Sequence, residues 1–281
     1  MFGRWHALCK AVAMTKHVLS AKRLFFVWVA LAFLLSWGGS AGAGDVNDQT
    51  HIRVAVASNF IAPMQALAKA FEAETAIRVL VSAGSTGKLF AQINNGAPFD
   101  VFLAANAREP ERLAAQSLAL AHTRFTYARG RLALWCRDAS TSAAARVCLN
   151  GSVSRLAIAN PRLAPYGQAA QSVIAALTPG DARIVTGENI SQAFQLVWSG
   201  NVTVGFVALS QLKSRSDIQG AYWLVPATLH DPIDQQAVLL RRATGNAHAQ
   251  AFLRYLQSDA ARAVIESFGY DVPRPQQAKA Q

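Results

Sequence analysis

The sequence predicts an α/β protein, because short β-branched runs alternate with amphipathic helical stretches along most of the chain. This alternation is typical of largely parallel sheets flanked by helices. It occurs in two sets, which are separated by a segment rich in aromatic and branched residues at 125–135. The 238 residues that follow Ala43 are enough for one large domain or for two lobes of ordinary size.

The N-terminal segment has the composition of a secretory signal peptide. Five cations and no acidic residue accompany an apolar run at 24–37, and residues 41–43 (AGA) are small, as a cleavage site requires. The run is shorter than the ~20 residues of a membrane span, so residues 1–43 are predicted to be a cleaved signal peptide. A signal anchor is the alternative, and Met14 is an alternative start that would give a leader of more ordinary length.

The first α/β set begins with a β-branched strand at 52–57. The next apolar positions recur at helical spacing from Met64 to Phe71, and Pro63 suits the first turn of that helix. The pattern continues with strand 77–82, helix 88–93 before Asn-Asn-Gly, strand 99–104 and helix 110–120.

The second set follows the segment at 125–135, which is interrupted by Arg-Gly-Arg at 129–131 and is interpreted as a long strand or a crossing between lobes. Gly269 is expected to cap the last helix. The expected elements are strand 156–159, helix 168–177, strand 183–185, helix 191–198, strands 202–207, 222–225 and 236–240, and helices 247–256 and 259–268.

Charge and cysteine content exclude several kinds of site. The formal charge of +11 falls to +6 without the five leader cations, and the remaining cations are scattered, which argues against a nucleic-acid-binding surface. Beyond the leader only Cys136 and Cys148 remain, and the sequence leaves open whether they form a disulfide or two buried thiols. No His, Cys, Asp and Glu spacing resembles a metal site.

Four strand-to-helix junctions share one chemistry. Each places small, hydroxyl-bearing or amide residues where the first backbone N–H groups of a helix lack intrahelical partners and face the positive end of its dipole. Such helix starts bind anions, although ordinary N-capping is the alternative for each of them alone. Two lie in each half of the chain, at 57–59, 84–87, 164–167 and 187–191, an arrangement that suits a ligand held between two lobes.

Two catalytic motifs are absent. Residues 82–89 (SAGSTGKL) resemble a phosphate-binding loop, but Ser82 and Leu89 stand where that motif needs Gly and a hydroxyl residue. No nucleophile elbow surrounds Ser85, and no acid–base pair or Ser/His/Asp arrangement stands out. The sequence therefore does not predict an enzyme.

At these junctions the chain resembles the periplasmic molybdate-binding proteins of ABC transporters, the ModA family. The resemblance covers essentially the whole chain after the leader, in order. The matching stretches are VAVASNF (54–60), SAGSTGKLFAQINNGAPFDVFLAAN (82–106), LAIANPRLAPYGQAA (156–170), VTGENISQAFQLVWSGNVTVGFVALSQ (185–211) and SFGYDV (267–272).

The resemblance implies a two-lobed type II periplasmic binding protein fold, with each lobe a mostly parallel sheet flanked by helices. The chain is expected to cross between the lobes twice, at 125–131 and 225–231, and the lobes to close about these crossings. The implied organisation is lobe 1 at 44–128 and 227–273, lobe 2 at 129–226, and a flexible tail at 274–281.

The resemblance also implies an oxyanion held by neutral hydrogen-bond donors, with no protein atom bonded to the metal and no cofactor. The implied contacts are Ser58, Asn59, Ser85 or Thr86, Tyr166, and the backbone N–H of Ile190. Some members carry a tyrosine where this chain has Ala208, so the phenolic donor is assigned to Tyr166.

The implied function is high-affinity capture of molybdate in the periplasm and delivery to an ABC importer, by a monomer. Molybdate needs donors only, whereas phosphate usually keeps a proton and requires an acceptor. Lys88 and Glu188 are expected to be solvated rather than to contact the ion. The alternatives are a binding protein for tungstate, sulfate or an organic acid, a secreted enzyme that uses Tyr166 or Glu188, and an interaction protein with an empty cleft.

Overall fold

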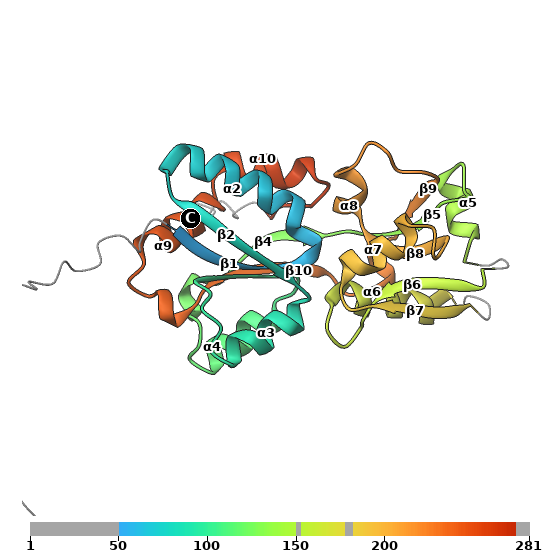
Figure 1. Ribbon diagram of the computed structural model, residues 1–281. Coiled ribbons are helices and arrows are strands. Elements are labelled where there is room, and N and C mark those ends of the chain that lie inside the picture. Colours follow the sequence, from blue (N-terminus) through green and yellow to red (C-terminus); the bar gives the residue numbers. More distant parts are fainter. Residues whose placement is uncertain (1–50, 150–152, 178–181, 274–281) are drawn as a thin grey trace, which may run out of the picture. The chain divides into compact units, whose positions relative to one another are not determined.

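The computed structural model describes residues 51–149, 153–177 and 182–273. The predicted signal peptide at 1–43 and the predicted tail at 274–281 lie outside these residues. The strands form two five-stranded sheets, which we call lobe 1 and lobe 2 together with the helices that cover them (Figure 1).

Lobe 1 is built on the sheet with strand order β2-β1-β3-β10-β4. Strand β1 is parallel to β2 and β3, whereas β10 is antiparallel to β3 and β4. Helices α2 and α10 lie on one face of the sheet, and α3 and α4 lie on the other (Figure 1). The elements are β1 His51–Ala57, η1 Ser58–Phe60, α2 Ile61–Thr75, β2 Arg78–Gly84, α3 Thr86–Asn94, β3 Val101–Ala104, α4 Arg108–Ala115, η2 Ala121–Thr123, β4 Phe125–Gly130, β10 Ile233–Leu239, η4 Arg241–Ala243, α9 Ala247–Tyr255 and α10 Asp259–Ser267.

Lobe 2 is built on the sheet with strand order β7-β6-β8-β5-β9. Strand β6 is parallel to β7 and β8, whereas β5 is antiparallel to β8 and β9. Cys136 and Cys148 form a disulfide, which settles the question that the sequence left open. The elements are β5 Leu132–Cys136, α5 Ser142–Val147, β6 Arg155–Ala159, α6 Pro165–Leu177, β7 Arg183–Gly187, α7 Ile190–Trp198, β8 Val204–Ala208, α8 Leu209–Lys213, β9 Ala221–Leu224 and η3 Ala227–Leu229.

The two sheets have the same topology. In each, the first strand of a β-α-β-α-β run lies between the second and the third, and two further strands are added beside the third. Strands β4 and β5 are joined through Arg131 although they belong to different sheets, and 225–232 leads back from β9 to β10. The strand inserted beside the third, β10 or β5, runs antiparallel to both of its neighbours, so four of the five strands in each sheet share one direction. Each sheet is therefore mixed but mostly parallel, as the sequence resemblance implies.

Helix boundaries differ from expectation where the backbone turns early. Helix α4 was expected to reach residue 120 but ends at Ala115, because Ser117 adopts a left-handed conformation (φ 58°) and Ala119 pairs with Leu240 in an extended bridge. The short helices α5 and α8 were not expected. Thr141 caps α5 by accepting from the Ala144 N–H at 3.2 Å, a signal that the sequence contained.

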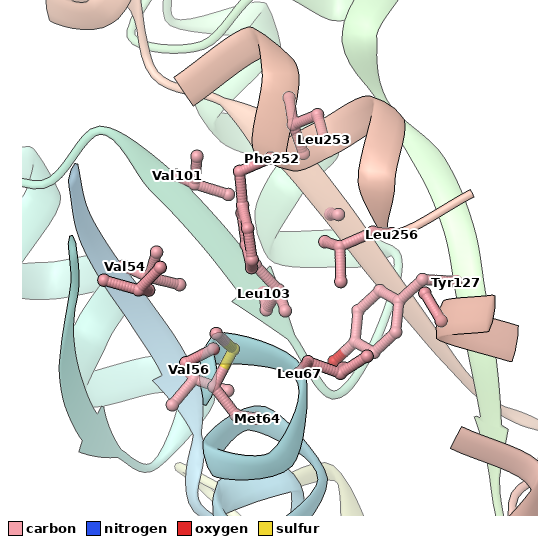
Figure 2. Packing of buried hydrophobic residues seen from close by; sticks show 14 of the residues in the cluster. Val54, Val56, Met64, Leu67, Val101, Leu103, Tyr127, Phe252, Leu253 and Leu256 are labelled. Atoms are coloured by element: carbon pink, nitrogen blue, oxygen red, sulfur yellow. The ribbon is translucent and has the colours of Figure 1, made fainter. Parts of the chain in front are cut away.

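The core of lobe 1 holds β1 rigidly. Val54 and Val56 point to the face covered by α2, α9 and α10, where they meet Met64 and Phe252 (Figure 2). Phe71 packs edge-on against Phe252, with ring centroids 5.2 Å apart. Truncation of one such side chain to alanine costs roughly 2–5 kcal/mol, so this core fixes the end of β1 from which the first junction starts. Within the described ranges, no helix combines the length and the apolar character needed to cross a bilayer.

Candidate functional site

The four junctions follow the carboxyl ends of corresponding parallel strands in the two lobes. Strands β1 and β2 of lobe 1 lead to Ser58 and Ser85, and β6 and β7 of lobe 2 lead to the starts of α6 and α7. Ligands of open α/β sheets bind outside these strand ends, where neighbouring connections diverge. Topology therefore places the predicted contacts at equivalent points of the two sheets.

Hydrogen bonds bring the junctions of the two lobes together. The Ser191 hydroxyl donates to the Ser58 carbonyl at 3.1 Å, which joins the fourth junction to the first. The Gly87 N–H donates to the Leu163 carbonyl at 2.9 Å, next to the third junction. Lys88 Nζ lies 2.9 Å from Glu188 Oε1 and links the second junction to the fourth. The junctions therefore surround one region of the molecule.

Ser85 and Thr86 differ in their hydrogen bonding. Ser85 is 2% exposed, and its hydroxyl is buried without a partner, although the residue stands at the N-cap of α3. Thr86 Oγ1 instead accepts from the Ala105 N–H at 3.1 Å. A buried hydroxyl without a hydrogen-bond partner destabilises the folded state by roughly 1–3 kcal/mol. Of the two hydroxyls, that of Ser85 would therefore gain more from a hydrogen bond to a ligand.

Ser58 and Asn59 form the buried turn η1 after β1. The Asn59 side-chain amide donates to Gln235 Oε1 at 2.9 Å and to the Tyr270 hydroxyl at 3.0 Å. The Asn59 carbonyl accepts from the Ser210 hydroxyl of lobe 2 at 2.9 Å. The amide donors of Asn59 are thus engaged within the protein, and a ligand contact by this residue would have to use its backbone N–H.

The lobe 2 junctions present backbone donors. Asn189 caps α7 by accepting from the N–H groups of Ser191 and Gln192 at 2.9 and 3.1 Å, which leaves Ile190 as the first helical N–H outside this cap. Tyr166 lies in the first turn of α6 directly after Pro165, which has no N–H to offer. Both residues belong to one buried cluster that also contains Ala57 at the end of β1.

Comparison with known proteins decides the family. The model of the bacterial extracellular solute-binding proteins matches residues 52–271. The molybdate-binding protein ModA of Azotobacter vinelandii is 43% identical over 224 residues, which cover 78% of this chain and 89% of the relative. The chain belongs to the ModA family of bacterial extracellular solute-binding proteins.

Two further comparisons agree with this family. ModA of Rhodobacter capsulatus is 37% identical over 244 residues, which cover 86% of this chain and 94% of the relative. The solved structure of the Azotobacter vinelandii periplasmic molybdate-binding protein has a TM-score of 0.75 and 36% identity, and the match covers 79% of this chain and all of that one. The two-lobed fold implied by the sequence resemblance is thus confirmed.

This ModA-family chain also contains a buried polar network that sequence analysis missed. Gln235 on β10 accepts from Asn59 and from the Tyr127 hydroxyl, the latter at 3.0 Å, and donates to the Tyr166 hydroxyl at 3.4 Å. The Tyr270 hydroxyl donates to the Asn59 carbonyl at 2.8 Å. A signal was present: Gln235 lies between Ile233 and Ala237 on the buried side of an alternating strand, where a polar residue requires partners.

The electrostatics of this ModA-family site come from neutral groups. Burial raises the pKa of the Tyr127 and Tyr166 phenols well above their ordinary value and that of Tyr270 to about 12, so all three stay protonated at neutral pH. Among the described residues no Lys or Arg is buried. The Lys88–Glu188 pair is partly exposed, as expected, although each group has the other as its partner.

Acidic and potentially metal-ligating side chains do not supply the candidate site with a free carboxylate or with a metal centre among the described residues. The carboxylate of Glu109 is buried, with Oε2 unpartnered, but its Oε1 is paired with Arg108. In the part of the chain that the structure describes, no three His, Cys, Asp or Glu side chains gather as a metal ion would require. The donors at the four junctions are hydroxyls and backbone N–H groups, a set suited to an anion.

Proposed function

We propose that this protein binds molybdate as a doubly negative oxyanion in the periplasm and delivers it to an ABC importer. The relatives named molybdate-binding proteins cover most of the chain. One structural observation carries the proposal for this chain: the buried Ser85 hydroxyl lacks a partner at the place where helix starts from both lobes meet.

The proposed contacts are neutral donors from both lobes. The hydroxyls of Ser58 and Ser85 and the N–H groups of Tyr166 and Ile190 form the set, and Asn59 adds its backbone N–H. Each charge-assisted hydrogen bond contributes roughly 1.5–3 kcal/mol, so a few of them are enough for tight binding. Thr86 is the alternative hydroxyl, but its Oγ1 already accepts a hydrogen bond from the Ala105 N–H, so we favour Ser85.

Neutral donors also explain how the site would select its ion. A buried fixed cation is costly to desolvate and would attract competing anions of any shape. Hydroxyls and N–H groups instead satisfy an ion that carries no proton, such as molybdate or tungstate. A protonated phosphate would place its own donor against these donors, and the smaller sulfate would leave them with stretched hydrogen bonds.

The proposed organisation follows the two crossings of the chain. The boundaries expected after residues 128 and 226 would lie slightly later, because β4 of the lobe 1 sheet ends at Gly130 and η3 belongs to lobe 2. The crossings at 125–131 and 225–231 would act as hinges. Binding would hold the lobes together in the form that a permease recognises. The protein would act as a monomeric carrier without catalysis or cofactor, after export by a cleaved signal peptide.

A thermal-shift and calorimetry panel of molybdate, tungstate, sulfate and phosphate tests this function on the purified chain. Ligand at about 100 times its Kd stabilises the folded state by about 2.7 kcal/mol, so molybdate should raise the unfolding temperature by several degrees. We expect tungstate to act similarly, and sulfate and phosphate to have little effect. A response to sulfate without one to molybdate would overturn the proposal.

A further inference from the structure

The phenol of Tyr166 reaches from lobe 2 to the crossing strands of lobe 1. The side chain is 1% exposed, and its hydroxyl accepts from Gln235 Nε2 of β10 at 3.4 Å. Gly130, the last residue of β4, lies against the same two groups. Although Tyr166 starts a helix that faces the proposed ligand, its phenol is therefore engaged with the strands through which the chain passes between lobes.

Gly130 leaves the space that this phenol occupies. A β-carbon at this position would lie 2.8 Å from Gln235 Nε2, 2.9 Å from Tyr166 Cζ and closer still to the Tyr166 hydroxyl. Gly130 does not have the positive φ that favours glycine on conformational grounds. The absence of a side chain therefore serves the close approach of Tyr166.

Gln235 is oriented so that its amide hydrogens face Tyr166. It is fully buried, and Oε1 accepts from both Asn59 and Tyr127 of lobe 1. These two donors fix which end of the amide points toward lobe 1 and leave Nε2 for the Tyr166 hydroxyl. Separation of the lobes would break the bond to Tyr166 while Asn59 and Tyr127 kept theirs.

We propose that Gly130, Tyr166 and Gln235 form a latch between the lobes, in which the Tyr166 phenol is a positioning group and not a ligand donor. This inference rests on the proposed function. The latch fixes the start of α6 relative to η1, and thereby aligns the Tyr166 N–H with the Ser58 and Ser85 hydroxyls around the anion. Its effect is to slow release of the bound ion.

Stopped-flow tryptophan fluorescence with molybdate tests the role of the phenol. Tyr166→Phe keeps the backbone N–H and should raise koff about fivefold, the effect of one neutral hydrogen bond, without loss of the preference for molybdate over sulfate. An unchanged koff would contradict the latch. A loss of preference for molybdate would also contradict it, because the phenol would then be contacting the ion.

Gly130→Ala tests the contact from the opposite side. The added methyl group must displace the phenol, so the Kd for molybdate should rise about 100-fold, consistent with the cost of overpacking. In a Tyr166→Phe background, Gly130→Ala should raise the Kd for molybdate by a smaller factor. Some increase should remain, because the ring carbon Cζ is still close to the added methyl group. Equal harm in both backgrounds would overturn the latch.

Gly245→Ala is the matched control, because a β-carbon there meets nothing within 4 Å, and it should bind like the wild type. If Gly130→Ala does not fold, the cycle of Gln235→Met with Tyr166→Phe replaces it. The two substitutions remove the same bond, so their effects on koff should not add; additive effects would contradict the latch.

Thermal unfolding without any oxyanion separates the two proposals. The Gly130→Ala and Tyr166→Phe cycle should show coupling in the unfolding temperature even in the absence of ligand, because the contact exists without it. If the wild-type protein bound no oxyanion, the proposed function would be wrong. The double-mutant cycle in the ligand-free protein would still test whether the latch exists. Strict additivity in the cycle would reject the latch whatever the ligand.

Discussion

The two lobes share a strand topology but present different chemistry at equivalent points. In lobe 1, the junctions after the first two strands offer the hydroxyls of Ser58 and Ser85, and the Ser85 hydroxyl has no partner. In lobe 2, the corresponding junctions offer the backbone N–H groups of Tyr166 and Ile190, and Asn189 satisfies the next two donors of α7.

The difference shows how one architecture divides a recognition task. A hydroxyl rotates to suit the ion, whereas a helix N–H is fixed by the backbone and sits at the positive end of the dipole. One adaptable and one rigid set of donors would together select an ion by size and by protonation.

Removal of the rigid donor at Ile190 should have the largest effect. Ile190→Pro deletes this N–H at the first position of α7, where proline is tolerated, and the extended Asn189 (φ −142°, ψ 176°) suits a following proline. Loss of a charge-assisted bond should raise the Kd for molybdate about 100-fold in calorimetry. Ile190→Val keeps the N–H and should bind normally; similar affinity for both variants would rule out this donor.

Removal of the adaptable donor at Ser85 should weaken binding about 30-fold, within the range of one hydrogen bond to a charged group. Because the hydroxyl has no protein partner, Ser85→Ala should not lower the unfolding temperature of the ligand-free protein. Ser267→Ala, at an exposed position in α10, is the control. If Ser85→Ala bound molybdate as tightly as the wild type, Thr86 and not Ser85 would be the hydroxyl donor.

The buried tyrosines of the polar network should make stability depend on alkaline pH. Burial raises the pKa of Tyr270 to about 12, so the folded state keeps a proton that the unfolded state loses above its pKa of about 10. Stability is thus fully present below pH ~10 and falls as pH rises toward ~12, by about 1.4 kcal/mol, or tenfold, at pH ~11. Urea unfolding of wild type and Tyr270→Phe measures this; equal pH dependence in both would contradict it.

The ion pair between Lys88 and Glu188 should have the smallest effect on release of the bound ion. Lys88→Met should raise koff about twofold, because exposed pairs contribute roughly 0–1 kcal/mol. Lys88→Glu combined with Glu188→Lys should restore the wild-type rate. A tenfold effect of Lys88→Met at high salt would instead indicate that the ammonium group contacts the ion.

Local patterns predicted most of the fold because each reports on its own segment. The apolar spacing from Met64 to Phe71 and the capping Gly269 gave helices close to α2 and α10. The direction of the strands added beside β3 and β8 was harder to predict, because it depends on how the chain crosses between lobes rather than on any local pattern. Helix α4 ended early because Ser117 adopted a conformation that its residue type does not announce.

The candidate site was predictable where it depended on helix starts and not where it depended on tertiary partners. The junction pattern predicts Ile190 and either Ser85 or Thr86, and only the bond from the Ala105 N–H to Thr86 Oγ1 favours Ser85. The engagement of Asn59 and of the Tyr166 phenol depends on Gln235, which is 176 and 69 residues away from them in sequence. Sequence spacing carries no information on such contacts, so the sequence alone could not predict the hydrogen bond between Gln235 and the Tyr166 phenol.

Anomalous diffraction at the molybdenum absorption edge, from crystals grown with molybdate, tests the central claim most directly. We predict one strong peak between the four junctions, with oxygens about 2.7–3.1 Å from the Ser58 and Ser85 hydroxyls and from the N–H groups of Tyr166 and Ile190. A peak elsewhere, or an ion held by a lysine or arginine side chain, would contradict the account.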